Sequence, residues 1–170
     1  MKKMLFLLAI VCSVNTVAQL KFTEDCTDLS GDCYIYPNYS LVVANSAKSK
    51  GFKIMPDVRR TTDSTLALNG LIVTLVNIGT CCEKNELIFL FADSTKMTVT
   101  SWNDFNCEGN AYYELSSDEA NQLNTKQIIK VQIKNGYSYD TFANSLVGDD
   151  RKYFMKVHTE VKANRVTVIK

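Results

Sequence analysis

The chain has 170 residues, with 19 basic and 18 acidic side chains and one histidine. This near balance argues against a nucleic-acid or anionic-membrane role, because both need an excess of lysine and arginine on one surface. The length suits one domain that buries its own core.

The first segment of the chain, residues 1–18, has the pattern of a cleaved signal peptide. Lys2 and Lys3 give it a positive start, and small residues precede Gln19. The apolar run over residues 4–14 is about eleven residues long, whereas a membrane span needs about 20. We therefore expect export and cleavage, not a membrane anchor.

Residues 19–170 then form the expected mature domain, secreted or periplasmic. Losing Lys2 and Lys3 would lower the basic residues from 19 to 17 against 18 acidic ones. No later apolar run is long enough to cross a membrane. We expect no integral membrane segment after processing and no nucleic-acid partner.

Cysteines are frequent for a chain of this size. Cys12 belongs to the apolar leader, which leaves five in the expected mature domain: Cys26, Cys33, Cys81, Cys82 and Cys107. In an oxidising compartment they should pair where geometry permits, with one left over. We expect a local Cys26–Cys33 bridge and a bond from Cys107 to Cys82 or Cys81. A vicinal Cys81–Cys82 disulfide is the less favoured alternative.

Strand signals dominate the first two thirds of the expected domain. Residues 20–33 are polar and are expected to be irregular. Asn69-Gly70 is the strongest short signal for a hairpin turn, and it divides an apolar stretch at residues 65–78. In chain order we expect strands over 33–36, 41–44, 51–55 (ended by Pro56-Asp57), 65–68, 71–78, 86–91, 97–102 and 111–115.

The last third combines helices and strands. A short helix is expected over 118–123, capped by Ser116 or Ser117. A second Asn-Gly pair, Asn135-Gly136, should join strands over 127–134 and 137–142. A longer helix should follow, capped by Asp149 or Asp150 and ended near Asn164, with its apolar face at helical spacing: Phe154, Val157 and Val161. Residues 165–170 are a last strand or a tail.

These elements predict an α+β fold. Most of it should be an antiparallel β domain, a sandwich or half-barrel, with a short inserted helix and a C-terminal helix.

Signatures of catalysis and metal binding are missing from the sequence. There is no Cys-x-x-Cys, no His-x-x-x-His and no calcium loop, so we expect no metal and no cofactor. Gly-x-Ser-x-Gly is also absent. His158, on the expected C-terminal helix, is the one candidate for a Ser-His-Asp arrangement, which only geometry can define.

Aromatic residues are the remaining candidates for binding. We select Trp102, Tyr112, Tyr137 and Tyr139, because exposed aromatic rings stack on sugars or contact a protein partner. Adjacent Tyr112 and Tyr113 must face opposite sides of a strand, whereas Tyr137 and Tyr139 would share one face. Ordinary strand packing is the competing interpretation of all four.

Three segments carry a resemblance: Trp102-Asn-Asp-Phe-Asn-Cys-Glu-Gly-Asn-Ala-Tyr-Tyr113, Leu115-Ser-Ser-Asp-Glu119 and Ile129-Lys-Val-Gln-Ile-Lys-Asn-Gly136. Together they resemble small exported bacterial proteins of unknown function. The resemblance implies a bacterial, extracytoplasmic setting, and neither a substrate nor a catalytic residue.

Three hypotheses for function follow. We favour a non-catalytic, exported binding domain whose partner is an unknown protein or carbohydrate. A small secreted hydrolase using His158 is the first alternative, and an inhibitor or immunity-type protein is the second. A pocket that collects Trp102, Tyr112 or Tyr137 with a carboxylate would favour ligand binding.

Overall fold

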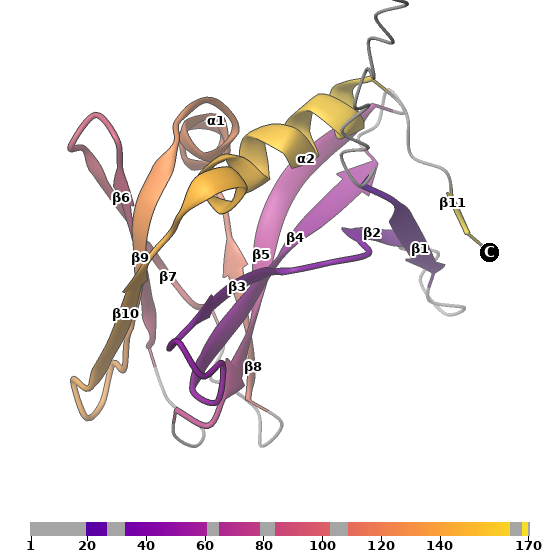
Figure 1. Cartoon of the computed structure of the whole chain (residues 1–170). Helices are drawn as coiled ribbons and strands as arrows, with labels where there is room; N and C mark the ends of the chain where they lie inside the picture. The colour runs from indigo at the N-terminus through magenta and orange to yellow at the C-terminus, as the bar shows by residue number, and fades with distance from the viewer. Residues whose placement is uncertain are drawn as a thin grey trace, which may run out of the picture.

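Two β-sheets packed face to face, with two helices at one end, make up the fold (Figure 1). The structure, a computed structural model, describes residues 20–26, 33–60, 65–78, 84–102, 109–163 and 168–169. Its elements are β1 (Phe22–Cys26), β2 (Cys33–Pro37), β3 (Leu41–Ala44), β4 (Gly51–Arg60), β5 (Leu66–Val76), β6 (Glu86–Phe91), β7 (Lys96–Thr100), β8 (Asn110–Glu114), α1 (Ser117–Thr125), β9 (Ile128–Lys134), β10 (Thr141–Ser145), a 3₁₀ turn (Gly148–Lys152), α2 (Tyr153–Lys162) and β11 (Val168–Ile169).

The described strands form a seven-stranded and a four-stranded sheet. The larger sheet has the order β11-β1-β2-β4-β5-β8, with β3 also paired to β4, and the smaller has the order β10-β9-β6-β7. Every pair is antiparallel except β1 with β11. The predicted α+β, mainly antiparallel class is therefore confirmed. Neither described helix is long and apolar enough to cross a membrane.

The core lies between the two sheets and under the helices. Strands alternate in side-chain direction, so every second residue enters it. In β7, Met97 and Val99 are buried while Thr98 and Thr100 are exposed, as predicted. Aromatic rings fill much of the interior, and the largest fully buried side chains include Phe22, Phe52, Phe89, Phe91, Tyr113, Tyr153 and Phe154.

The short helix α1 begins as the sequence predicted. Ser116 is the N-cap, and its hydroxyl accepts the backbone N–H of Glu119. The Glu119 carboxylate accepts the backbone N–H of Ser116 in return, at 2.8 Å. This reciprocal pair satisfies two N–H groups that a helix start leaves without partners.

The longer helix α2 buries its predicted apolar face but starts differently. Phe154, Val157 and Val161 are buried. The predicted capping by Asp149 or Asp150 is wrong, because both lie in a 3₁₀ turn and Lys152 is an N-cap without a side-chain bond. Gly148 enters that turn at φ +54°, and this tight first turn displaces the α-helix start to Tyr153. Asn164 lies outside the described residues.

Tyr153 ties α2 to the sheets through a buried hydroxyl. The hydroxyl donates to the carbonyl of Tyr39 at 2.7 Å, and the two rings meet edge to face. Burial, and secondarily the nearby Tyr39, raises the pKa of the Tyr153 phenol. The phenol has a pKa of about 10 in the unfolded chain and a higher pKa in the folded protein. Its contribution to stability is therefore complete below the unfolded pKa and is lost as the pH rises through the folded pKa.

Replacing Tyr153 by phenylalanine should therefore lower the stability at neutral pH but make the stability less sensitive to alkaline pH. At neutral pH the lost hydrogen bond should lower the free energy of unfolding by about 1 kcal/mol. Above about pH 10 the variant should lose less further stability than the wild type. Urea unfolding at neutral and alkaline pH measures both, with exposed Tyr137→Phe as the control. Equal alkaline losses in wild type and variant would contradict it.

The hairpin predicted at Asn69-Gly70 is wrong. Strand β5 runs through both residues from Leu66 to Val76. Asp57 pairs with Gly70 and Val58 with Leu68, so Asn69 is an extra residue in the ladder, a β-bulge. On the other side of β5, strand β8 pairs with the residues from Gly70 to Thr74. Two flanking strands therefore override the local preference for a turn.

Strand β4 also runs past its predicted end at Pro56-Asp57. On the edge of β4 that faces away from β5, β3 pairs with residues 51–54 and β2 pairs with Val58. Pro56 lies between these two paired stretches, where no described strand pairs with that edge. A proline is tolerated at such a position because it removes no ladder hydrogen bond there.

Gly70 is required by close packing, not by its φ angle. An added Cβ would lie 2.7 Å from the carbonyl oxygen of Tyr113 on β8. We expect Gly70→Ala to lower the free energy of unfolding by about 1–3 kcal/mol, the usual cost of overpacking. Ala67→Ser, which adds one heavy atom at an exposed position of the same strand, is the control. Identical urea midpoints for both variants would show that β8 moves aside freely.

The second Asn-Gly pair does join antiparallel strands, but through a longer loop. The loop covers residues 135–140, and β10 begins at Thr141 and not at Tyr137. The Asn135 side-chain oxygen accepts the backbone N–H groups of Tyr137 and Ser138 at 2.8 and 2.9 Å. This local turn competes with the strand. The positive φ falls on Tyr139, at 60°, and not on Gly136.

The described residues of the entry segment and of the last segment include strands. Residues 20–33 were expected to be irregular, yet Phe22–Cys26 is β1, antiparallel to β2. Its Phe22 is fully buried, so core packing explains a strand that lacks sequence periodicity. The strand alternative for residues 165–170 is confirmed for Val168 and Ile169, which form β11 and pair with β1 in parallel.

Candidate functional site

A groove of about 720 Å³ lies on the outer face of the seven-stranded sheet, the face turned away from the core. Its volume falls within the range of about 300–1,000 Å³ that small-molecule sites occupy. The residues that line it come from β1, β2, β4, β5, β8 and the end of β7: Asp25, Tyr34, Tyr36, Met55, Asp57, Arg59, Asn69, Gly70, Leu71, Ile72, Trp102, Tyr112, Tyr113 and Glu114.

Strand alternation explains why these side chains share one face. On β4, Ile54 and Val58 are fully buried in the core, so Met55, Asp57 and Arg59 point the other way. Met55 is opposite Ile72 on β5, which is opposite Tyr112 on β8. Three neighbouring strands thus build an apolar floor that ends at an aromatic ring.

A charged cluster lies beside this apolar floor. Asp57 is 6% exposed, and its carboxylate accepts from Arg59 Nε at 3.1 Å and from Asn69 Nδ2 at 3.4 Å, both through Oδ2. The other oxygen, Oδ1, is buried without a hydrogen-bond partner among the described residues. A buried carboxylate oxygen without a donor carries a desolvation cost. Asp57 therefore holds Arg59 and Asn69 in place through Oδ2, while its unpartnered Oδ1 lies below the accessible surface of the groove.

Arg59 bridges the charged cluster to the aromatic residues of β2. Its guanidinium carbon lies 5.0 Å from the centre of the Tyr34 ring, within the range of a cation–π contact. Ile35 pairs with Val58, so the antiparallel register puts Tyr34 beside Arg59 and Tyr36 beside Asp57. Both tyrosines therefore face the groove.

Trp102 and Tyr112 form the opposite side of the groove. The ring centres lie 5.9 Å apart at 38°. The backbone N–H of Trp102 donates to the carbonyl of Tyr112 at 3.2 Å, which anchors the residue after β7 to β8. Even so, the Trp102 side chain is 69% exposed. Two of the four predicted binding aromatics are therefore together, with Asp57 and Glu114 in the same groove.

The other two predicted aromatics lie elsewhere. Tyr137 and Tyr139 belong to the β9–β10 loop of the smaller sheet, are 82% and 70% exposed, and do not line the groove. Lys134 Nζ lies 5.4 Å from the Tyr139 ring. The groove also contains four residues that were not predicted as binding residues: Tyr34, Tyr36, Asp57 and Arg59. The alternation of apolar residues on β4 was the available signal, but it was hidden by the premature strand end predicted at Pro56-Asp57.

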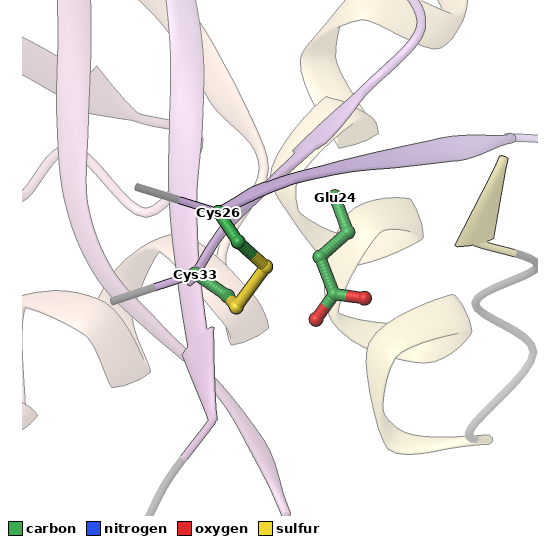
Figure 2. Close-up of side chains that lie close together, drawn as sticks. All are labelled: Glu24, Cys26 and Cys33. Carbon is green, nitrogen blue, oxygen red and sulfur yellow. A yellow bond between two sulfur atoms is a disulfide. The ribbon is translucent and has the colours of Figure 1, made fainter. Parts of the chain in front are cut away.

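The predicted local bridge between Cys26 and Cys33 is confirmed. The two residues are directly opposite in the β1–β2 ladder, with Cα atoms 4.1 Å apart, and form a disulfide. Figure 2 shows the Glu24 carboxylate beside it. The three potential ligand atoms lie within 4.8 Å of one another, but sulfurs bonded to each other are not thiolate ligands. Cys81, Cys82 and Cys107 lie outside the described residues.

His158 is half-buried on α2 and does not line the groove. Among the described residues, no hydrogen bond or ion pair joins His158 to a serine, a cysteine or an acid. The geometry that a Ser-His-Asp mechanism needs is therefore not formed by this part of the chain.

No family model, no curated protein and no solved structure matches the chain.

Proposed function

We propose that the protein is a non-catalytic binding domain whose ligand site is the outer groove of the seven-stranded sheet. The observation that carries the proposal is the meeting of Trp102 and Tyr112 with the buried Asp57 carboxylate in one concavity. Such a site combines flat apolar surfaces with a few fixed polar groups, as ligand pockets generally do.

A second candidate, a hydrolase, is favoured by one feature of the same groove. Asp57 and Glu114 are both cross-strand partners of Gly70, one on each side, so two carboxylates share the outer face. Paired carboxylates perform acid–base chemistry in glycosidases. This candidate does not involve His158, and product analysis separates it from simple binding.

Trp102 makes the binding proposal directly testable, because it is the only tryptophan of the chain. Its fluorescence should change and saturate when a groove ligand is added from a panel of neutral glycans, charged glycans and short peptides. Tyr112→Ala should abolish the response at the same ligand concentration, and Tyr137→Ala, on the other sheet, should leave it unchanged. A panel without any saturable response, or a response that Tyr112→Ala leaves intact, would refute the proposal.

We propose that the domain acts outside the cytoplasm. The support is the charge and hydropathy pattern of residues 1–18, which lie outside the described residues, together with the Cys26–Cys33 disulfide. Intact-mass measurement of exported protein should give a chain that begins at Gln19. Exported material that retains residues 1–18, or that carries a lipid on Cys12, would contradict this.

A further inference from the structure

We infer that the ligand of the groove is a neutral oligosaccharide held between two aromatic pairs; this inference rests on the proposed binding function. One pair is Tyr34 and Tyr36 on β2, and the other is Tyr112 with Trp102 at β8. Three strand intervals separate β2 from β8 in the sheet, roughly 14 Å at about 4.8 Å each. That span suits several linked sugar rings better than one.

Aromatic faces match sugars because the C–H groups of a pyranose ring carry a slight positive charge. The face of an aromatic ring is its negative side, so the two stack with the sugar hydroxyls directed outward. Trp102 offers the most accessible ring, at 69% exposure. Met55 and Ile72 continue the apolar floor between the two pairs.

The polar groups between the aromatic pairs fit hydroxyl groups. A sugar hydroxyl both donates and accepts, and adjacent hydroxyls present the two functions side by side. Arg59 uses only Nε toward Asp57 and has a side chain that is 48% exposed, and Glu114 is exposed in the same groove. A guanidinium donor and a carboxylate acceptor of this kind would bind hydroxyls of a sugar.

Charge argues for a neutral glycan over an acidic one. The side chains that line the groove include three carboxylates, of Asp25, Asp57 and Glu114, and one guanidinium, of Arg59. This excess of negative charge repels uronic acids, phosphates and sulfates. A neutral sugar pays no such penalty.

The pairing of β5 argues against an extended peptide that adds a strand along the floor of the groove. Peptides that add a strand need an unpaired sheet edge. Strand β5, in the floor of the groove, pairs with β4 on one side and with β8 on the other, so it has no free edge; β8 is the last strand in the sheet order. A basic peptide attracted by the carboxylates is the remaining competitor, and salt distinguishes it, because ionic attraction weakens with ionic strength.

Calorimetry and Trp102 fluorescence on the purified full chain test the inference. The neutral probes are cellotetraose, maltotetraose, mannotetraose and the tetramer of N-acetylglucosamine; the charged probes are tetragalacturonic acid and tetralysine. At least one neutral tetramer should bind with an affinity insensitive to salt. Tyr112→Ala and Asp57→Asn should each weaken it about tenfold or more, whereas Tyr139→Ala should change it less than about twofold. Circular dichroism verifies the fold of each variant.

The outcomes separate this inference from the function on which it rests. One outcome is that tetralysine binds in a salt-sensitive way, that Tyr112→Ala abolishes this binding, and that no neutral tetramer binds. This outcome would refute the oligosaccharide inference but keep the binding function. Binding of tetragalacturonic acid alone would do the same. If the wild type cleaves a tetramer and Glu114→Gln does not, the protein is a hydrolase and not a binding domain, and the oligosaccharide remains its ligand. No saturable response to any probe would overturn the oligosaccharide inference.

Discussion

Replacing Phe154 by alanine should lower the free energy of unfolding by about 3–5 kcal/mol. Phe154 is 1% exposed, and its ring meets Phe89 of the smaller sheet edge to face at 6.2 Å. The neighbouring Tyr153 ring lies 5.1 Å away. The alanine variant would leave a cavity between α2 and β6 that rigid strands cannot close. A loss of this size is a large fraction of the usual stability of a domain.

Thermal and urea unfolding measure the effect. A domain of this length should melt roughly 10 °C lower. Lys162→Ala, at an exposed position near the end of the same helix, is the matched control and should stay within about 0.5 kcal/mol of the wild type. Equal stabilities for the two variants would mean that α2 does not pack on the sheet in the way described.

The secondary-structure prediction succeeded where side-chain burial is periodic. The capping signal at Ser116, the alternation in β7 and the apolar face of α2 are all local, and a short window of sequence contains them. The fold class follows from such elements, because sheets and helices with one apolar face must pack on one another.

The failures arose where partners distant in sequence decide the structure. Asn69-Gly70 favours a turn in isolation, but β4 and β8 hold it inside a strand. Phe22 and its strand β1 depend on pairing with β2 and with the chain end at β11. No local window of sequence contains these contacts.

The candidate site was predictable only in part for the same reason. Trp102 and Tyr112 are ten positions apart in the chain, and their aromatic character alone singled them out. Asp57, by contrast, became a candidate only once the structure showed its burial and its unpartnered oxygen. Tyr137 and Tyr139 were placed on a strand face, but the side chain of Asn135 turns the backbone there and leaves both rings in an exposed loop.

Removing the Cys26–Cys33 disulfide should be the second large perturbation. The bridge joins residues seven positions apart in sequence, and closing so short a loop stabilises by on the order of 2–3 kcal/mol in the chain-entropy model. Cys26→Ser with Cys33→Ser should therefore lower the free energy of unfolding by about that amount. The effect arises mainly in the unfolded chain, which regains freedom that the crosslink had removed.

Each single replacement, Cys26→Ser or Cys33→Ser, should cost as much as the double replacement, because the bond is lost either way. Urea unfolding of the three variants without reductant measures this. The groove provides an internal control: Tyr34 and Tyr36 follow Cys33 on β2, and Ile35 between them still pairs with Val58. Trp102 fluorescence of the folded variants should therefore match the wild type. A double variant as stable as the wild type would show that β1 and β2 are held by the ladder and the buried Phe22 alone.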